Sequence, residues 1–468
     1  MAAVTDSVRG VAFGDRPRSR EPPVRRWNRL IAPLALLAVV AAPTALLCAA
    51  LAGTDDEPML TPVRGAFRLE GHGYGHGRGM SQWGAQGAAA EGIDYRKILS
   101  TYYPGTTLIR HSDNPRLRVL ITAADTGELR VLPVRGLSVA QGDGTERRLP
   151  TAWAGRTVTQ WRARPGDDGL QLAGRASGAW HNLTLARRTA DRPIRFVAPG
   201  RTVRLVLPEE IRDYRGDLRA DLVGDALRVV NGVHLEGYLR SVVPSESLST
   251  WRPDALAAQA VAARSYARWR ADHARAGGTD ICDTSACQAY HGVRRVTGSG
   301  RVTNWEASST DRAVTRTAGE YLDYGGSVAF TEFSASNGGW SRAGDEPYLV
   351  AKPDPWDGLV HSSGHLWQAA VRPARLARHW PQVGRVLAIA VHRRDGRGDW
   401  GGRVLSVKLI GTKKSIRVSG EAFSSAMRLR DSWWHAASGQ DLTPSPSPSG
   451  RPTLPPLPVL PIASPRPR

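Results

Sequence analysis

Residues 253–267 read PDALAAQAVAARSYA and decide the fold more than any other stretch of this chain. Proline is favoured at the first position of a helix, and the alanines that follow lie nearly all round the helix surface. Because other backbone can approach small side chains closely, the pattern predicts a buried helix that ends by the glycine pair at residues 277–278. Gln259, Arg264 and Tyr266 would be buried with it, and buried polar groups need a reason to be there.

The rest of the folded region is expected to be rich in strands. Apolar residues alternate at a period of two between Gly, Asp and Asn, which is typical of strands. Such runs occupy residues 117–121, 203–207, 227–230 and 404–410. Shorter helices are expected at residues 81–91 and 95–102. These patterns predict an α+β fold over residues 65–436, with strands in the majority.

Glu246 stands just before the predicted buried helix, in the sequence VVPSESLSTW of residues 242–251. The preceding residues 235–243 are expected to form a strand that leads into a proline-fixed turn. Apolar neighbours such as Val243 and Trp251 would desolvate the carboxylate. Desolvation raises the pKa of a carboxyl group, and a general acid at neutral pH needs a raised pKa. The alternative interpretation is a glutamate that starts a helix, or a charge exposed to solvent.

A second polar segment is rich in glycine. Residues 71–85 read GHGYGHGRGMSQWGA, with six glycines in fifteen residues. Glycine allows positive φ angles and leaves no Cβ between the backbone and a bound molecule, so the pattern predicts one wall of a ligand site. Its candidate contacts are His72, His76, Ser81 and Gln82. The alternative is a glycine-rich hairpin in which the histidines are ordinary polar residues.

A third polar segment, FSASNGGWS at residues 333–341, follows a strand-like run at residues 327–333. We expect a loop here. Its backbone N–H groups and the hydroxyls of Ser334 and Ser336 can hydrogen-bond sugar oxygens, although an ordinary turn would have the same composition.

The two ends of the chain differ in composition from the middle. Arginine-rich residues 1–29 precede an apolar run at residues 30–52, and acidic residues follow it, which predicts a cytoplasmic N-terminus with the rest of the chain outside. The run is long enough for a transmembrane anchor, whereas its final Ala-Leu-Ala would suit cleavage as a signal peptide. The Pro- and Ser-rich residues 443–468 cannot bury a core and are expected to be disordered.

The charge of the chain bears on its partners. Lysine and arginine number 63 against 43 acidic residues, a net charge of +20 at pH 7. This charge favours a polyanionic neighbour, such as nucleic acid or an anionic cell envelope. The sequence has no helix-turn-helix pattern, zinc-finger spacing or basic-aromatic RNA motif, so a nucleic-acid partner is not expected.

Beyond the apolar run the chain has two cysteines, Cys282 and Cys287. An even pair in an exported chain is typical of a disulfide that closes a short loop. Zinc is the competing interpretation, but a structural site needs four ligands, and the nearby His273 and His291 do not give a usual spacing. We therefore expect a disulfide and neither a metal nor another cofactor.

Four segments in combination resemble the SpoIID/LytB family, which comprises sporulation-stage-II-D-type peptidoglycan lytic transglycosylases and modifiers of amidase autolysins. They are residues 71–85, residues 243–246 with 255–267, residues 280–290, and residues 333–339. The resemblance covers roughly residues 65–436. It implies a SpoIID-like domain with the buried helix beside an active-site cleft, in an extracytoplasmic protein that is anchored to the membrane or secreted to the cell wall.

The chain departs from the family pattern in two places. The Gly-His-Gly segment usually closes the domain, whereas here it opens it, within residues 65–110, which looks like a circular permutation. Such a permutation is plausible if the two ends of the domain lie close together. Family members that bind zinc in the cysteine loop have a histidine just before the second cysteine, and here that position is Ala286.

Carried over residue by residue, the resemblance makes Glu246 the catalytic acid and base. It places His72, His76, Ser81, Gln82, Gln259, Arg264 and Ser336 in or around the cleft, and Tyr266 and Ser334 complete the candidate substrate contacts. Ordinary glycosidases use two carboxylates. A lytic transglycosylase needs one, because the 6-hydroxyl of the sugar attacks the anomeric carbon and leaves a 1,6-anhydro-muramic end.

Three functions follow as hypotheses. The leading one is an exported enzyme that cleaves the β-1,4 bond between N-acetylmuramic acid and N-acetylglucosamine. The second is a protein that grips glycan strands and stimulates a separate amidase autolysin, with Glu246 as a sugar ligand. The third is an envelope scaffold that acts through the Pro-rich tail. Peptidoglycan glycan strands, an amidase and, through residues 30–52, the membrane are the expected partners.

Overall fold

The computed structural model describes residues 59–140, 146–167, 169–184, 193–274, 278–361 and 364–438, together with the backbone of 442–443. The basic segment 1–29, the apolar run 30–52 and residues 444–468 of the tail lie outside the described residues. Within the described part of the chain, no helix is both long and apolar enough to cross a membrane.

Two sheets pack around the largest hydrophobic core. The first consists of β5 (Arg116–Leu120), β7 (Ser138–Ala140), β8 (Glu146–Arg148), β13 (Ile194–Val197), β16 (Asp217–Val223), β17 (Ala226–His234) and β18 (Ile281–Cys282). Its order is β18-β5-β17-β16-β13-β7-β8, and β18 is parallel to β5 while the other pairs are antiparallel. Alternate residues such as Val119 and Phe196 point into the core and are fully buried, as a pleated strand with one buried face requires.

The second sheet consists of β6 (Leu129–Leu132), β9 (Ala152–Trp153), β10 (Arg156–Gly166), β11 (Gly169–Ala176), β12 (Ala179–Leu183), β14 (Val203–Val206), β15 (Glu210–Tyr214), β19 (Arg294–Thr297) and β20 (Val302–Asn304). Its order is β12-β11-β10-β6-β14-β15-β19-β20, with β9 paired to β10. A short 3-10 turn, Thr122–Ala124, follows β5. Trp161 of β10 is fully buried between the sheets and is the largest side chain of this core.

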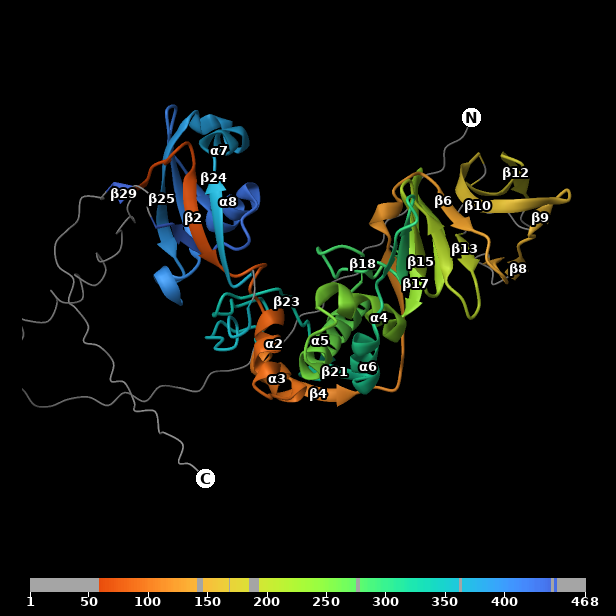
Figure 1. Cartoon of the computed structure of the whole chain (residues 1–468), viewed down its shortest axis with the longest axis horizontal. Helices are drawn as coiled ribbons and strands as arrows, with labels where there is room; N and C mark the ends of the chain where they lie inside the picture. The colour runs from red at the N-terminus through yellow and green to blue at the C-terminus, as the bar shows by residue number, and fades with distance from the viewer. Residues whose placement is uncertain are drawn as a thin grey trace, which may run out of the picture. The chain divides into compact units, whose positions relative to one another are not determined.

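Helices gather around α5 (Pro253–Asp272), the helix predicted from its alanines (Figure 1). The others are α2 (Gln82–Ala90), α3 (Tyr95–Tyr102), α4 (Leu235–Glu246) and α6 (Ser308–Arg316). A small sheet of β4 (Thr107–Arg110), β21 (Glu320–Tyr324) and β22 (Ser327–Val328) lies beside them. Every residue of α5 from Ala255 to Ala267 is buried, which confirms the prediction.

Two local predictions were wrong. Residues 235–243 form most of helix α4 rather than a strand, because their buried apolar residues recur at helical spacing. Pro244 lies inside that helix, where it has no N–H to donate to the carbonyl of Arg240, and the helix ends two residues later. Residues 327–333 do not form one strand either. The chain leaves β22 and pairs again only at β23 (Phe333–Ser334), which runs parallel to β3 (Met80–Ser81).

The third part of the fold joins residues from both ends of the described chain. Its strands are β1 (Met59–Leu60), β25 (Val386–Arg394), β26 (Val404–Gly411), β27 (Ile416–Ser419) and β29 (Leu442–Thr443), in the order β27-β26-β25-β1-β29. A second sheet of β2 (Phe67–His72), β24 (Leu366–Val371) and β28 (Trp434–Ala436) has the order β24-β2-β28. Helices α7 (Pro373–His379) and α8 (Gly420–Met427), and the 3-10 turns Pro381–Val383 and Asp399–Gly401, complete it.

We call this part the terminal module. Phe67 and Leu69 of β2 and Trp434 of β28 are buried in its separate core. Strand β2 therefore pairs with two strands, β24 and β28, that lie far from it in the sequence. Residues 71–85 begin at the end of β2, so strands near the C-terminus fix the position where this segment starts. The two ends of the described chain lie close together, as the permutation hypothesis requires.

Candidate functional site

A pocket of about 520 Å³ lies around Glu246 and is lined by five separate segments of the chain. Its residues are Tyr74, Gly75, His76, Arg78 and Gln82 of the glycine-rich segment, Glu246 and Tyr266, Ser285, Ala286 and Cys287 of the cysteine loop, and Glu332, Phe333, Ser334 and Ala335. The structure thus brings the predicted candidates His76, Gln82, Tyr266 and Ser334 to one pocket with Glu246.

Glu246 is the last residue of α4 and remains partly exposed to the pocket. Its Oε1 accepts a 2.6 Å hydrogen bond from the backbone N–H of Ala289, and its Oε2 accepts one of 3.4 Å from the side-chain amide of Gln82. Burial raises the pKa of the Glu246 carboxyl, and the two hydrogen bonds only partly oppose this. The negative end of the α4 dipole acts in the same direction as burial. Glu246 is therefore suited to hold a proton and to donate it.

His76 is an uncharged donor and acceptor at neutral pH. Burial first, and the neighbouring Arg78 charge second, lower the pKa of the His76 imidazole to about 4. Its Nδ1 accepts a 3.0 Å hydrogen bond from the backbone N–H of Arg78. The neutral ring carries its proton on Nε2, and a hydrogen bond with the backbone of Phe333 acts against the lowering of the pKa.

Glu332 is a second carboxylate in the pocket, and the sequence patterns did not single it out. Arg78 holds it through two hydrogen bonds, of 2.7 Å from Nε and 2.6 Å from Nη2. Such a bidentate pair fixes both side chains. The signal that could have found it is Arg78 itself, because an arginine in a segment expected to be a site wall needs an acidic partner.

Two glycines of the segment serve contacts within the protein. Gly79 has φ +62°, and a Cβ there would overlap the carbonyl oxygen of Glu332. Gly77 has φ +72°, and a Cβ there would lie 2.5 Å from Nη2 of Arg403. From the sequence alone, the glycines are expected to contact a bound molecule. At these two positions the close neighbour is instead another part of the chain.

Ser81 and Ser336 lie behind the pocket wall. Ser81 is the N-cap of α2, where its hydroxyl accepts from the N–H of Gly84, and it donates to Asp357 at 2.8 Å. The hydroxyl of Ser336 donates to the same carboxylate at 2.9 Å. Burial alone would raise the pKa of Asp357, but hydrogen bonds from His365 and from the two serines lower it overall. Neither serine lines the pocket, and their substrate contacts stay predictions.

Arg264 is fully buried and holds three helices together. Its Nε and Nη2 donate to Glu236 of α4 at 2.8 and 2.9 Å, and Nη2 also donates to the carbonyl of Val314 in α6. The guanidinium is thus engaged away from the pocket lining. These contacts within the protein explain why an arginine is buried in α5, and the explanation requires no bound ligand.

Gln259 and His72 do not line the pocket either. Gln259 is 1% exposed, and its side-chain amide makes no hydrogen bond to any residue that the structure describes. His72, at the end of β2, packs against Trp400 and Trp433 with ring centroids 4.4 and 4.9 Å away. Their binding roles therefore remain predictions.

The cysteine loop forms another side of the pocket. Cys282 and Cys287 form a disulfide with their Cα atoms 5.6 Å apart. Cys287 lines the pocket, and Ala289, two residues further, binds Glu246. Among the described ranges, no three His, Cys, Asp or Glu side chains are grouped as a metal site. The cross-link holds the segment that positions the carboxylate.

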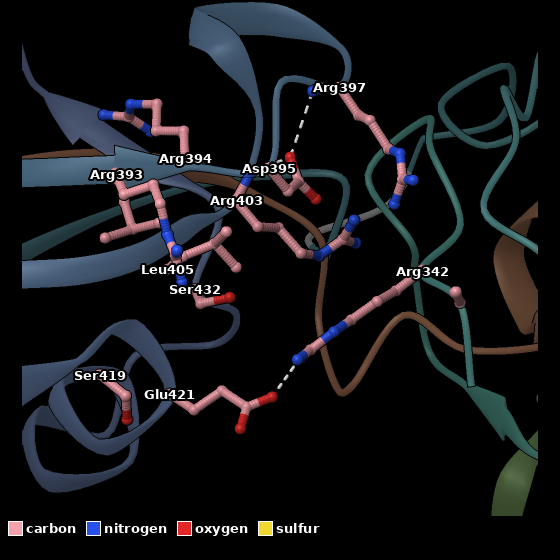
Figure 2. Close-up of a pocket in the computed structure, with 12 residues that line it drawn as sticks. Arg342, Arg393, Arg394, Asp395, Arg397, Arg403, Leu405, Ser419, Glu421 and Ser432 are labelled. Carbon is pink, nitrogen blue, oxygen red and sulfur yellow. Dashed lines mark hydrogen bonds and ion pairs between the residues drawn. The ribbon is translucent and has the colours of Figure 1, made fainter. Parts of the chain in front are cut away.

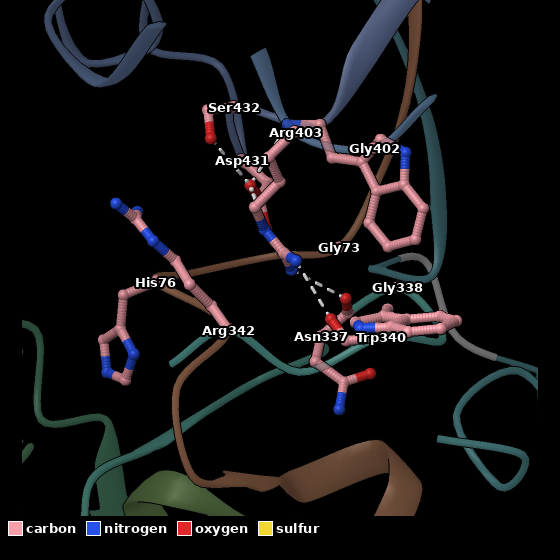
Figure 3. Close-up of polar contacts among 12 residues, drawn as sticks. Gly73, His76, Asn337, Gly338, Trp340, Arg342, Gly402, Arg403, Asp431 and Ser432 are labelled. Carbon is pink, nitrogen blue, oxygen red and sulfur yellow. Dashed lines mark hydrogen bonds and ion pairs between the residues drawn. The ribbon is translucent and has the colours of Figure 1, made fainter. Parts of the chain in front are cut away.

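The loop at residues 333–341 is braced from the terminal module by a buried ion pair. Arg403 binds Asp431, with Nε 3.2 Å from Oδ1, and both side chains are almost fully buried. Its Nη1 and Nη2 donate to the carbonyls of Trp340 and Asn337 at 2.9 and 2.8 Å (Figure 3). The pair thereby ties the terminal module to the loop at residues 333–341.

Comparison with known proteins identifies the middle of this structure. Residues 223–324 match the model of a family described as SpoIID, stage II sporulation protein. That match includes Glu246, α5 and the cysteine loop, whereas residues 71–85 and 333–341 lie outside it. The match confirms the family resemblance within residues 223–324, and the resemblance of residues 71–85 and 333–339 stays a prediction.

Two curated relatives share part of the chain. An amidase enhancer of Bacillus subtilis is 38% identical over 125 residues, 25% of this chain and 15% of that protein. An uncharacterized protein of Brachyspira hyodysenteriae is 35% identical over 142 residues, 30% of this chain and 36% of that protein. The matched region thus spans 15% and 36% of these relatives.

Proposed function

We propose, from the premise that residues 223–324 belong to the SpoIID family, that this chain is an extracytoplasmic cell-wall protein that cleaves peptidoglycan glycan strands. Its reaction is that of a lytic transglycosylase. It breaks the β-1,4 bond between N-acetylmuramic acid and N-acetylglucosamine and leaves a 1,6-anhydro end.

The observation that carries this proposal is the state of Glu246. Its carboxyl has a raised pKa, opens to a pocket, and is held by Ala289 and Gln82. The other pocket carboxylate, Glu332, is engaged by Arg78. One carboxyl group is therefore available for proton transfer, which suits a reaction that needs only one.

The steps follow from that single group. Protonated Glu246 donates its proton to the glycosidic oxygen as the bond from the anomeric carbon to that oxygen breaks. The 6-hydroxyl oxygen of the muramic acid then attacks the anomeric carbon, and the Glu246 carboxylate takes the hydroxyl proton. Glu246 ends the cycle protonated again, and no water is consumed.

Neighbouring side chains support these steps. Gln82 orients the Glu246 carboxyl through its 3.4 Å hydrogen bond. The neutral His76, Tyr266 and Ser334 line the same pocket. These groups would position the sugar ring relative to the carboxyl group.

The second candidate function is a glycan-binding enhancer of an amidase. The name of the Bacillus subtilis relative favours it, because that protein is called an amidase enhancer. In this function the same pocket grips the glycan, and Glu246 accepts hydrogen bonds from sugar hydroxyls without transferring a proton.

One experiment separates the two. Purified glycan strands are incubated with the full chain, and the products are analysed by mass spectrometry for 1,6-anhydro ends. We expect such ends with the wild type and a loss of about 10²–10⁴-fold in Glu246→Gln, which keeps the shape of the side chain but not its acid. Glu209→Gln, at an exposed position outside the pocket, is the matched control.

The outcome that favours the enhancer is equally definite. If the wild type releases no anhydro ends but speeds peptide release by an added amidase, the chain is an enhancer. If Glu246→Gln cleaves at the wild-type rate, Glu246 is not the acid and the proposed mechanism is wrong.

A further inference from the structure

A second pocket, of about 560 Å³, is lined by arginines (Figure 2). Four of them belong to the terminal module, and Arg342 directly follows the loop at residues 333–341. The arginines are Arg342, Arg393, Arg394, Arg397 and Arg403. Two carboxylates, Asp395 and Glu421, line it with them. The pocket therefore concentrates positive charge in a concave surface, which attracts anions.

Three of these guanidinium groups are held by the protein. Arg403 is paired with Asp431 and Arg342 with Glu421. Arg394 donates to the carbonyls of Gly402 and Trp434, both at 2.9 Å. These contacts give the pocket a fixed wall.

The positive charges of the other two arginines are not neutralised by an acidic side chain of the pocket. Arg393 and Arg397 are exposed, and their guanidinium groups form no ion pair with any residue that the structure describes. The Asp395 carboxylate, which could neutralise them, accepts instead from the backbone N–H groups of Arg397 and Arg403 at 3.2 and 3.0 Å. Two charged forks thus face the pocket without an acidic partner.

The backbone of β25 is irregular where it supplies two of these arginines. Successive residues of a regular strand point to opposite faces, yet Arg393 and Arg394 both line the pocket. The pairing with β26 shifts register on both sides of Arg393, which is the mark of a bulge. Bulges re-aim side chains at functional sites.

We propose that this pocket binds the phosphate groups of a phosphodiester polymer. A guanidinium fork matches phosphate oxygens, and a tetrahedral phosphate offers several acceptors to two forks that line one pocket, as Arg393 at the end of β25 and Arg397 in the turn after it do. A cavity of about 560 Å³ is in the range that holds ligands much larger than one phosphate ion. The net charge of +20 fits a polyanionic neighbour rather than a small solute.

The pocket lies next to the Glu246 pocket, with the glycine-rich segment between them. The N–H of Arg342 donates to the carbonyl of Gly77 at 2.8 Å, and Gly77 leaves room for the Arg403 guanidinium. The adjacent His76 and Arg78 line the Glu246 pocket. Figure 3 shows Arg342 between His76 and Arg403. A polymer held by the arginines would thus run beside the cleavage site, but its binding does not depend on the reaction of Glu246.

The test is calorimetric titration of the full chain with a synthetic oligo(glycerol phosphate), at low and at physiological salt. We expect binding that weakens with salt, since ionic contacts are screened. Arg393→Ala and Arg397→Ala should each weaken it on the order of tenfold, and the double variant about a hundredfold. Arg385→Ala is the matched control, because Arg385 is exposed and lies just before the opposite end of β25.

Each other outcome overturns a defined part of the proposal. Equal weakening by Arg385→Ala would show general surface charge rather than a site. Equal binding of polyglutamate at matched charge would overturn the phosphate preference, and orthophosphate binding as tightly as the oligomer would overturn the polymer. The same titration with Glu246→Gln should give the wild-type affinity, so the result stands apart from that of the cleavage assay.

Discussion

The side-chain amide of Gln82 donates a hydrogen bond to the carboxylate of Glu246 across 164 residues of sequence. It joins the N-terminal turn of α2 to the C-terminal end of α4. The glycine-rich segment is thereby connected to the group that we propose as the acid, so we expect the pH response of the proposed reaction to depend on a residue outside the matched family segment.

Gln82→Ala should shift the high-pH limb of the pH–rate profile of glycan cleavage to higher pH. The hydrogen bond from Gln82 favours the ionised carboxylate and lowers the pKa of Glu246, so its removal raises that pKa further. A general acid must be protonated, hence activity persists to higher pH. The measurement is the pH dependence of kcat/KM, with Gln368→Ala, on an exposed position of β24, as the control. A limb that moves downward or not at all would contradict the assigned role.

His76 should make the fold sensitive to acid. Its pKa is about 4 in the folded chain and near 6.5 when unfolded, so the folded state prefers the neutral ring. The stability that this contributes is present above pH 6.5 and is lost as the pH falls toward 4. His76→Asn, which keeps an acceptor near Nδ1, should flatten this loss in thermal unfolding followed against pH. His361→Asn, at an exposed position, should follow the wild type.

Arg264→Met should destabilise the fold by on the order of 3–5 kcal/mol, because it leaves Glu236 and buried carbonyls without their partner. The control lies one turn further along α5. Arg268→Met breaks only partly exposed pairs with Asp113 and Asp272 and should cost about 1 kcal/mol or less. Urea unfolding measures both. If Arg264→Met lost glycan affinity while its free energy of unfolding stayed unchanged, Arg264 would be a substrate contact rather than a structural residue.

A rearranged chain tests the permutation hypothesis. Strands β1 and β29 are antiparallel neighbours, with Met59 opposite Thr443, so a short hairpin can link residue 443 to residue 59. A chain that begins at the exposed Asp113 and ends at Ser112 should keep the circular dichroism spectrum and the cleavage rate within about threefold. An unfolded product would show that the native order of segments is required.

The sequence predicted those elements whose signals are local. Helix α5 was found because proline and alanine mark its start and its burial, and α2 and α3 lie within one or two residues of their predicted bounds. Helix α4 was missed because its two valines before Pro244 look strand-like when read alone. The pairing of β1 with β29 and of β3 with β23 joins residues far apart, which one sequence does not reveal.

In the candidate site, too, the sequence predicted features with a local signal and missed contacts between residues that are distant in the sequence. Residue chemistry selected Glu246, His76 and Gln82, and the fold gathers them in one pocket. Chemistry alone did not separate ligand contacts from internal partners, as Ser81 and its bond to Asp357 show. Glu332 escaped notice because it belongs to no pattern, and its place follows only from its pairing with Arg78.

The position of β2 between β24 and β28 sets the order in which the protein can mature. A chain leaves the ribosome with its N-terminus first, so β2 emerges hundreds of residues before β28 exists. The β2 end of the glycine-rich segment lacks its β28 neighbour until residues 434–436 have been made, whereas its partners at residues 332–336 are made earlier. A polypeptide that stops before residue 434 keeps every residue that lines the Glu246 pocket but lacks the strand that completes the β24-β2-β28 sheet, so the strand from which the glycine-rich segment leaves would be held on one side alone.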